Sequence, residues 1–273
     1  MHCGGADAVQ PPSRRNHRSA GRSGVVVVSD RPRQLAANLA GLRARIEAAA
    51  RASGRAGADI TLVAVSKTFP ASDIVALLDL GVSDFGENRD KDAAAKAAEI
   101  ADRAPGRSLR WHFVGQLQRK KARSVASYAD VVHSVDRVDL AEALGRAAAR
   151  AGRCVDALVQ VNLEGRDDFA AGEEARGGVR PNDVVALAER VADTDGLRLA
   201  GVMALAPLGG DPDAAFARLA VLAEGVRGVA ADAVAISAGM SADLEAAIRH
   251  GATHVRVGTA LFGGRALMSD HVR

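Results

Sequence analysis

The sequence predicts an α/β fold, a single (β/α)8 barrel of the TIM type with an extra N-terminal helix. Three observations indicate this fold. Short apolar runs alternate with Ala-rich amphipathic runs along most of the 273 residues, the alternation repeats eight times, and polar residues and glycines follow the ends of the apolar runs. A closed barrel buries every strand and has no sheet edge, whereas an open parallel sheet, the alternative fold, has two.

The N-terminal segment differs in composition from the rest of the chain. Residues 1–24 contain four arginines and one aspartate, a net charge of +3 that equals the net charge of the whole chain, so the remaining sequence is neutral. Gly, Pro, Ser and Arg dominate this segment, a composition typical of disorder. We therefore expect residues 1–29 to be a disordered basic tail, residues 30–266 to form the barrel and residues 267–273 to be a C-terminal tail. With a neutral barrel, we expect no nucleic-acid partner.

The first predicted element is a helix from Asp30 to Ser53, with Asp30 as its N-cap and Pro32 in its first turn. Eight short runs that alternate with helical patterns are predicted as strands. They are Ile60–Val65, Val82–Phe85, Arg110–Val114, Val131–Ser134, Ala157–Asn162, Leu199–Met203, Ala233–Ser237 and Thr253–Val257. Helical patterns lie between successive strands. They fall near residues 71–80, 90–102, 118–128, 137–151, 181–193, 212–227 and 241–249.

Composition excludes several classes of site. The only cysteines are Cys3 and Cys154, too few for a disulfide framework or a cysteine metal site, and they fit a reducing cytoplasm. No apolar stretch approaches the roughly 20 residues that span a bilayer, and the N-terminus has no hydrophobic signal core. Three histidines, His133, His250 and His254, are scattered without metal-ligand spacing. We expect a cytoplasmic protein with no membrane partner and no metal.

Functional residues of a βα barrel lie at the carboxyl ends of its strands. Lys67 follows the first predicted strand, and the run Arg256-Val-Gly-Thr259 ends the eighth. A lysine amine can condense with an aldehyde as a Schiff base, and backbone amides in a Gly-rich turn can hold a phosphate. Together these residues favour pyridoxal phosphate as the cofactor. The alternatives are a solvated charge at Lys67 and ordinary glycine turns.

The ends of the seventh and eighth predicted strands supply candidate phosphate ligands. Ser237, Gly258 and Thr259 offer a hydroxyl or a backbone amide where many barrels bind phosphate. A helix that begins near Ser241 would direct its positive dipole end at the same group.

Arg256 is a candidate contact of the pyridine ring. It points into the barrel mouth if its neighbours Val255 and Val257 face the surrounding helices. A guanidinium beside the pyridine nitrogen disfavours protonation of that nitrogen, which weakens the electron sink that carbanion chemistry needs. The alternative is a salt bridge of Arg256 inside the barrel.

Two further polar residues have competing interpretations. His112 could line the wall of the mouth, although a histidine on a barrel strand is more often hydrogen-bonded in the core. Glu87 can be interpreted as the cap of the helix that follows it.

Five motifs, in this order along the chain, resemble the pyridoxal phosphate homeostasis proteins (YggS/PROSC family). They are Val65-Ser-Lys-Thr68, Phe85-Gly-Glu-Asn88, Trp111-His-Phe-Val-Gly-Gln-Leu-Gln118, Ser237-Ala-Gly-Met-Ser-Ala-Asp243 and Val255-Arg-Val-Gly-Thr-Ala-Leu-Phe-Gly263. The resemblance spans about residues 31–265.

The resemblance implies a barrel like the N-terminal domain of alanine racemase. It also implies pyridoxal phosphate (PLP) bound as a Schiff base to Lys67, with Arg256 facing the pyridine nitrogen. It further implies phosphate contacts from Ser237, Gly258 and Thr259. Asn88 and Met240, which belong to the same motifs, complete the predicted cofactor site.

The sequence departs from the family pattern at two places. Lys120 stands where the family has an asparagine, within a basic run from Arg119 to Arg123 that is interpreted as a solvated helix face or as a surface for an anionic partner. The loop from Glu164 to Arg180 has Arg176-Gly-Gly178 in place of a Lys-x-Gly pattern. We assign no site to that loop.

No catalytic residue is expected. The only tyrosine, Tyr128, is predicted away from the mouth, whereas a two-base racemase of the alanine type needs a tyrosine on the opposite face of the cofactor. The resemblance implies a cofactor binder without an established activity. We expect a monomer that buffers PLP or delivers it to apo PLP-dependent enzymes. The alternatives are a PLP-dependent amino-acid racemase or lyase, and a cofactor-free aldolase that uses Lys67 on a phosphorylated sugar.

Overall fold

A computed structural model describes residues 30–164 and 177–264. The predicted tails, residues 1–29 and 267–273, lie outside the described residues. The chain divides into Met1–Asp30 and a second unit, Arg31–Arg273, to which every described helix and strand belongs.

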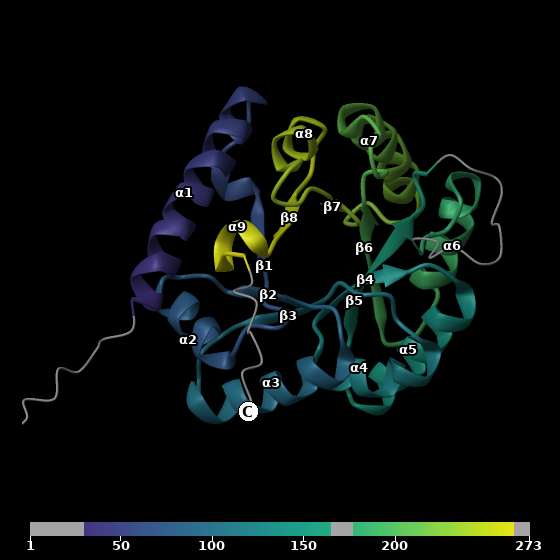
Figure 1. The fold of residues 1–273 in the computed structure, drawn as a ribbon. Coiled ribbons are helices and arrows are strands. Elements are labelled where there is room, and N and C mark those ends of the chain that lie inside the picture. The colour runs from purple at the N-terminus through teal and green to yellow at the C-terminus, as the bar shows by residue number, and fades with distance from the viewer. Residues whose placement is uncertain (1–29, 165–176, 265–273) are drawn as a thin grey trace, which may run out of the picture. The chain divides into compact units, whose positions relative to one another are not determined.

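The second unit contains a closed barrel of eight parallel strands, each paired with its neighbours in chain order, with β8 paired to β1. The strands are β1 Thr61–Val65, β2 Asp84–Glu87, β3 Arg110–Phe113, β4 Val131–Val135, β5 Val155–Val161, β6 Leu197–Ala204, β7 Ala235–Ser237 and β8 His254–Val257. The (β/α)8 prediction is confirmed, and the open-sheet alternative is wrong. Figure 1 shows the strands inside a ring of helices.

Nine α-helices surround the strands within the described part of the chain. They are α1 Arg31–Ala52, α2 Ala71–Asp79, α3 Asp90–Arg103, α4 Ala122–Tyr128, α5 Val138–Arg150, α6 Val184–Ala192, α7 Pro212–Val229, α8 Leu244–Arg249 and α9 Thr259–Phe262. Among these residues, none of the helices combines the length and the apolar content needed to cross a bilayer.

Most predicted boundaries agree with the structure to within two residues. Three helices, predicted from residues 118, 181 and 241, begin three or four residues later, and at the first two positions a 3-10 turn precedes the α-helix. The helix predicted from Ser241 begins only at Leu244, because residues 241–243 form a turn in which the Asp243 carboxylate accepts a hydrogen bond from the Met240 amide at 2.6 Å. The four-residue helix α9 was not predicted, since it is too short to show a periodic pattern.

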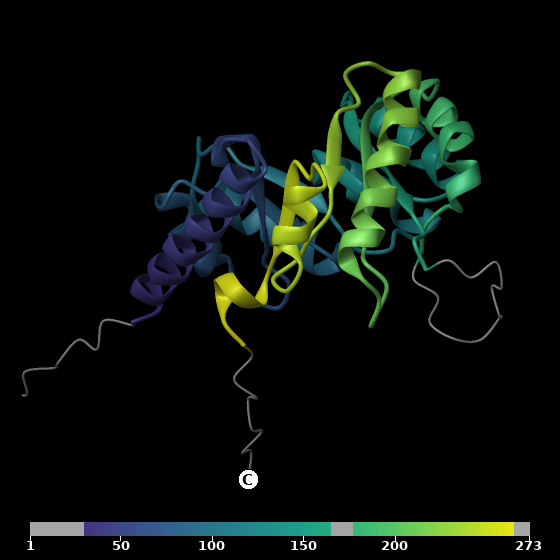
Figure 2. The same ribbon diagram turned by 90° about the horizontal axis from the view of Figure 1, so that it is seen from above.

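Helix α1 occupies the place of an eighth outer helix. Its buried residues Leu35, Leu39, Leu42 and Ile46 repeat at helical spacing and pack against β8 and α8 in one apolar cluster. Figures 1 and 2 both show α1 (purple) beside α8 and α9 (yellow). The extra N-terminal helix is therefore structural, because α9 alone is too short to cover β8 and β1.

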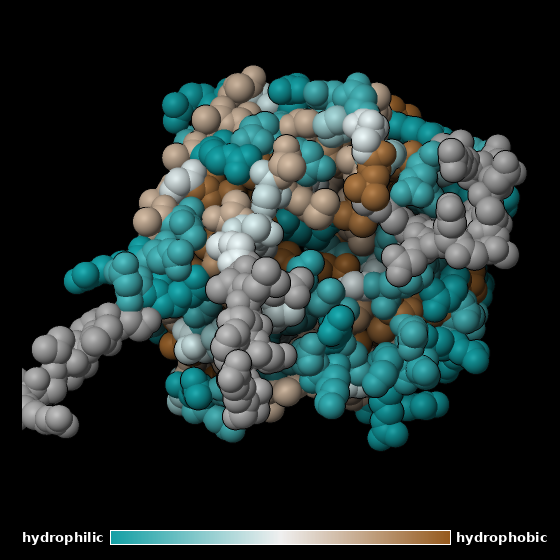
Figure 3. Space-filling model, in the orientation of Figure 1, coloured by the Kyte–Doolittle hydropathy of each residue, from teal (hydrophilic) through white to brown (hydrophobic). Residues whose placement is uncertain are grey.

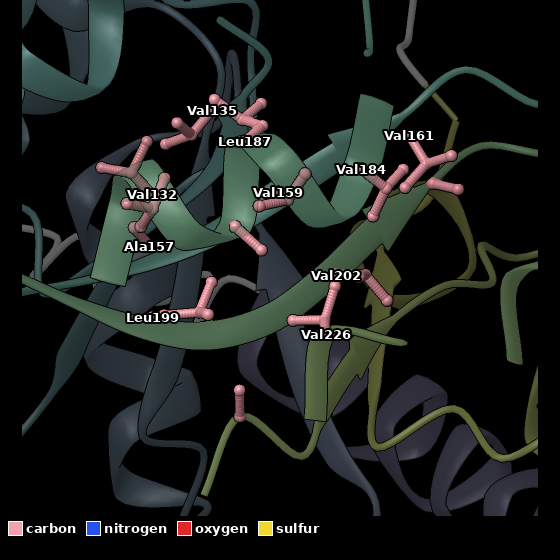
Figure 4. Close-up of a cluster of buried hydrophobic side chains, with 14 of the residues drawn as sticks. Val132, Val135, Ala157, Val159, Val161, Val184, Leu187, Leu199, Val202 and Val226 are labelled. Carbon is pink, nitrogen blue, oxygen red and sulfur yellow. The ribbon is translucent and has the colours of Figure 1, made fainter. Parts of the chain in front are cut away.

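The largest apolar cluster lies between the strands and the helices on the other side of the barrel. Figure 4 shows part of it, where side chains of β4, β5 and β6 meet α6 and α7. Val132, Val159, Val202 and Val226 are all fully buried there. Full burial of one such side chain stabilises the fold by about 1.5–3 kcal/mol. This shell fixes the strands, and thereby the residues at their ends.

Candidate functional site

Two adjoining cavities lie at the carboxyl end of the barrel, with volumes of about 330 and 390 Å³. Residues from β1, β2 and β8 border both of them. The shared residues are Val65, Lys67, Asn88, Gly258 and Thr259. Residues at the ends of β3, β6 and β7, together with Arg256 of β8, complete the wall of the second cavity. They are Val114, Gly115, Leu205, Met240, Ser241, Ala242 and Arg256. The volumes suit a small organic molecule.

Six of the seven predicted cofactor-binding residues border these cavities. They are Lys67, Asn88, Met240, Arg256, Gly258 and Thr259. Figure 3 shows this face of the molecule in space-filling form, with apolar surface (brown) visible near the centre between hydrophilic regions (teal). The structure thus brings together residues that are separated by nearly the whole length of the barrel sequence.

A larger cavity, about 630 Å³, lies at the opposite end of the barrel, between α1 and the first residues of β1 and β2. The charged groups on its wall already have partners: Arg43 donates to the Leu80 carbonyl oxygen at 3.1 Å, and Glu47 accepts from the Gly57 amide at 3.1 Å. None of the predicted site residues borders it. The mouth, rather than this cavity, is the candidate site.

Lys67 is exposed and projects from a tight turn. It makes no hydrogen bond or ion pair within the described residues, so its amine is free to react. The turn is closed by a bond from the Phe69 amide to the Ser66 carbonyl oxygen, at 3.0 Å. Thr68 in this turn has a φ of 67°, a left-handed conformation that a β-branched residue adopts only under strain. Strained backbone of this kind is concentrated at functional sites.

A buried ionic cluster supports this turn from below. The Glu87 carboxylate, which is 1% exposed, accepts from the Ser66 hydroxyl at 2.7 Å and from Lys96 Nζ at 2.6 Å. The interpretation of Glu87 as a helix cap is therefore wrong, because its side chain turns inward to the Lys67 strand. Sequence analysis missed Lys96, which resembles any other solvated lysine on an amphipathic helix.

The end of the site next to α8 and α9 is rich in unpaired amides. Within the described part of the chain, the Ser241 and Ala242 backbone N–H groups donate to no acceptor. The Thr259 N–H opens α9 and so has no partner inside that helix. Together with the Ser241 hydroxyl, these groups could hold a phosphate.

Ser237 is the one predicted residue that the structure does not place on the wall of the mouth. It is fully buried inside the barrel, and its hydroxyl is engaged with Arg256 at 2.6 Å and His133 at 2.9 Å. The geometry does not support the phosphate contact predicted for Ser237. Ser241, four residues later, stands on the wall instead. The signal was present in the sequence, since both serines belong to the same motif.

Arg256 lies at the floor of the mouth and is only 5% exposed. It donates to the Ser237 carbonyl oxygen at 2.8 Å and to the Ala204 carbonyl oxygen at 2.9 Å. Its neighbours Val255 and Val257 pack outward against α1, as the inward orientation of Arg256 requires. No carboxylate pairs with Arg256 among the described residues, so the salt-bridge alternative is wrong. Burial lowers the pKa of Arg256 to about 10, which leaves it charged at neutral pH.

The histidines do not lie as the sequence suggested. His112 is buried and hydrogen-bonded, as expected of a core histidine, but its partners are His133 at 2.8 Å and Asp84 at 2.9 Å. His254 lies close by, with its ring centroid 6.4 Å from that of His133. His133 and His254 are therefore not scattered. Within the residues that the structure covers, no group of side chains suits a metal ion.

The remaining residues that were weighed lie away from the mouth. Tyr128 is in α4 and does not border the cavities, in agreement with its predicted position. Lys120 borders a basic groove between α4 and α5. The departure from the family pattern at this position is therefore remote from the candidate site.

Comparison with known proteins decides the family. The model of the alanine racemase N-terminal domain matches residues 37–266. A pyridoxal phosphate homeostasis protein of Mycobacterium tuberculosis is 42% identical over 255 residues, which cover 88% of this chain and 96% of the relative. The chain belongs to the pyridoxal phosphate homeostasis protein family. A member from Escherichia coli is 36% identical over 238 residues, 85% of this chain and 97% of the relative. The resemblance found in the motifs is confirmed.

Solved structures extend the comparison within this family. PipY of Synechococcus elongatus, whose structure was determined with PLP bound, is 35% identical and superposes with a TM-score of 0.71, covering 84% of this chain and all of PipY. Alanine racemase from Corynebacterium glutamicum has a TM-score of 0.61 at 12% identity, and this chain covers 64% of it. At this low sequence identity, the comparison with the racemase shows only that the fold is shared.

Proposed function

We propose that this chain binds PLP through Lys67 as a Schiff base and serves in intracellular PLP homeostasis, as a buffer or a carrier without turnover. The observation that carries this proposal is the unpaired Lys67 amine in a small-molecule cavity that has a cluster of free amides on one wall and Arg256 on its floor. The 42% identity to homeostasis proteins and the PLP-bound structure of PipY support the same ligand.

The residues of the site divide the work of holding the cofactor. The Lys67 amine would hold the aldehyde carbon of PLP through a C=N bond, whose formation releases water. The amides of Ser241, Ala242 and Thr259, with the Ser241 hydroxyl, hold the phosphate. This assignment replaces Ser237 by Ser241 and keeps Gly258, at which any side chain would enter the space beside the Val65 carbonyl oxygen, 3.3 Å away. Asn88 and Met240 border the cavity between the two ends.

The electrostatics of the cavity floor support the proposed absence of turnover. Bound PLP would supply an electron sink for carbanion chemistry, and a charged Arg256 beside its ring nitrogen weakens that sink. Apart from Lys67 and Arg256, the residues on the wall of the larger mouth cavity have no ionisable side chain. A second acid–base group for a racemase is therefore missing from that wall.

The test is the visible absorption spectrum of the purified protein with added PLP, for the wild type, Lys67→Ala and Lys67→Arg. We expect a yellow band in the wild type that both variants lack, and borohydride reduction should fix the label on the peptide that contains Lys67. Lys67→Arg is the matched control, because it keeps the charge and cannot form the C=N bond. A colourless wild type would overturn the proposal and favour the cofactor-free aldolase.

The absence of turnover and the delivery role have separate tests. Amino acids incubated with the loaded protein in deuterated water should show no exchange of the α-proton at enzymatic rates, and such exchange would support the racemase or lyase instead. Mixing the loaded protein with an apo PLP-dependent enzyme should restore that enzyme's activity. Under this proposal the protein is cytoplasmic and monomeric.

A further inference from the structure

A line of hydrogen bonds runs through the inside of the barrel, from the first residue of β2 to the floor of the mouth. Five side chains from five strands take part, and four of them are at most 5% exposed. The bonds join Arg256 Nη1 to Ser237 Oγ (2.6 Å), Ser237 Oγ to His133 Nδ1 (2.9 Å), His133 Nε2 to His112 Nδ1 (2.8 Å) and His112 Nε2 to Asp84 Oδ1 (2.9 Å). We call this line the barrel chain.

The two-residue period of the strands places the barrel chain inside the barrel. Val131 belongs to an interior apolar cluster with Leu158 and Met203, and His133 lies two residues further along β4 on the same face. Ser237 lies two residues after Ala235, which packs on the same cluster. The polar residues therefore form the next interior layer towards the mouth. Polar groups at this depth are tolerated only when their hydrogen bonds are satisfied.

The two ends of the barrel chain, together with neutral imidazoles between them, fix the direction of every bond in it. A guanidinium can only donate, so Arg256 donates to Ser237. An ionised carboxylate can only accept, so His112 Nε2 donates to Asp84. With neutral imidazoles, the remaining bonds have one arrangement: the Ser237 hydroxyl donates to His133 Nδ1, and His133 Nε2 donates to His112 Nδ1.

We propose that the barrel chain orients the Ser237 hydroxyl and thereby holds the Arg256 guanidinium at the floor of the mouth, so that His133 and His112 are positioning residues of the PLP site. This inference rests on the proposed function, because only the proposed function places Arg256 beside the ring nitrogen of PLP. In this arrangement His133 Nδ1 accepts the Ser237 hydrogen, which turns that hydrogen away from Arg256 and leaves an oxygen lone pair directed at the guanidinium.

The surroundings of His133 keep its imidazole neutral. Burial lowers its pKa well below the usual value, and the neighbouring His112, Arg256, His254 and Arg110 lower it further. No carboxylate is in contact with the ring among the described residues.

The far end of the barrel chain stays ionised. Burial acts to raise the pKa of Asp84, but the hydrogen bonds from His112 and Ser83 outweigh it, and the net shift is downward. A neutral interior and an anionic end are the states that the single arrangement of hydrogens requires.

Nitrogen NMR of the histidine-labelled, cofactor-free full chain tests the arrangement directly. At pH 7.5 we expect His133 as a neutral imidazole with its hydrogen on Nε2, and His133 should not titrate between pH 6 and 8. Assignment comes from the spectra of His133→Asn and His112→Asn. A hydrogen on Nδ1 of His133, or titration of His133 near pH 6.5, would overturn the proposal.

Cofactor binding by variants tests the positioning role. His133→Phe removes the acceptor for Ser237, and we expect the Kd for PLP to rise at least tenfold. His133→Asn places an amide oxygen near the position of Nδ1 and should stay within threefold of the wild type. The matched control is His254→Phe, which changes a neighbouring barrel histidine that bonds to Thr253 instead of the barrel chain, and it too should stay within threefold.

The outcomes separate this inference from the proposed function. If the wild type binds no PLP, the proposed function is wrong. The NMR result still tests the arrangement of hydrogens in the barrel chain. If the wild type binds PLP but His133→Phe binds as tightly, or His254→Phe loses as much affinity, the positioning role is wrong while the proposed function stands. If His133→Phe does not fold, Ser237→Ala, which removes the same link, replaces it with the same tenfold expectation.

Discussion

Lys96 Nζ donates to the carbonyl oxygen of Ser66 at 2.7 Å, so a helix that belongs to the second βα unit holds the residue that precedes Lys67. The same ammonium pairs with Glu87 at 2.6 Å. Lys96 and Glu87 are 12% and 1% exposed, so water screens the pair poorly. The position of Lys67 therefore depends on a lysine that the mouth itself does not contain.

Lys96→Met tests this dependence. Removal of the ammonium leaves a buried carboxylate whose remaining partner is Ser66, and breaking a buried pair in this way costs about 3–5 kcal/mol. We expect the free energy of unfolding in urea to fall by about 3 kcal/mol. Lys91→Met, on the exposed side of the same helix, should change it by less than about 0.5 kcal/mol. Equal losses in the two variants would show that the cluster does not stabilise the turn.

A second prediction concerns acid. Burial, and after it the neighbouring His112, lower the pKa of His254 from 6.5 to about 4. Between these two values the unfolded chain binds more protons than the folded chain, so stability falls as the pH falls from 6.5 to 4. The loss from this group is at most about 3 kcal/mol.

Urea unfolding at pH 7.5, 6, 5 and 4.5 measures this loss. The slope of stability against pH should become shallower in His254→Gln and should persist in His250→Gln, which changes the C-cap residue of α8, a partly exposed histidine that pairs with Asp213. An unchanged slope in His254→Gln would show that the folded protein accommodates the protonated ring.

The fold was predictable because its signals are local. Each strand and helix has its own period, and the alternation of the two fixes the barrel order. Six of the seven predicted cofactor residues border the mouth cavities because strand ends converge in any βα barrel. Ser237 does not border them because a side chain at the last residue of a strand can turn inward or outward, and the choice depends on partners far away in the chain.

Long-range partners were not predictable. His133 and Ser237 are 104 residues apart in sequence, and no spacing rule connects them. Glu87 and Lys96 are nine residues apart, but their pairing depends on burial against Ser66, which sequence alone does not give. The role of α1 likewise followed only from the shortness of α9.

The left-handed conformation of Thr68 leads to a third prediction. A non-glycine residue in the left-handed conformation destabilises the fold by about 1–2 kcal/mol, and glycine removes this strain. The greater entropy of glycine in the unfolded chain offsets about 0.5–1 kcal/mol of that gain in stability. Thr68→Gly should therefore raise the free energy of unfolding by about 0.5–1 kcal/mol. Thr61→Gly, in the regular strand β1, should lower it by about 1 kcal/mol. A loss of stability in Thr68→Gly would mean that the threonine side chain contributes more than its backbone costs.

The structural role of α1 gives a fourth prediction. Leu39 is 2% exposed in the cluster that joins α1 to β8 and α8. Leu39→Ala should lower the free energy of unfolding by about 2–5 kcal/mol, from lost burial and the cavity that remains. Leu208, which is 84% exposed, is the matched control, and Leu208→Ala should change stability by less than about 0.5 kcal/mol. Differential scanning calorimetry of both variants measures the difference in stability. A small effect of Leu39→Ala would show that the packing of α1 does not stabilise the barrel.

Gly258, in the proposed site, and Gly239, in the turn before α8, should respond differently to a methyl group. Gly239 has a φ of 89°, and a Cβ there would lie 2.7 Å from the Ala247 Cβ and 3.0 Å from the Leu244 Cα, so Gly239→Ala must displace the turn before α8. We expect it to lower the free energy of unfolding by about 2 kcal/mol or more and to weaken PLP binding.

Gly258 has an ordinary φ of −110°, and the nearest atom to its Cβ would be the Val65 carbonyl oxygen at 3.3 Å. Gly258→Ala should therefore cost less than about 1 kcal/mol of stability, while its methyl group, on the wall of the cavity, raises the Kd for PLP about tenfold. Urea unfolding and PLP titration of both variants separate folding from binding, and a Gly258→Ala variant that binds PLP like the wild type would remove Gly258 from the proposed site.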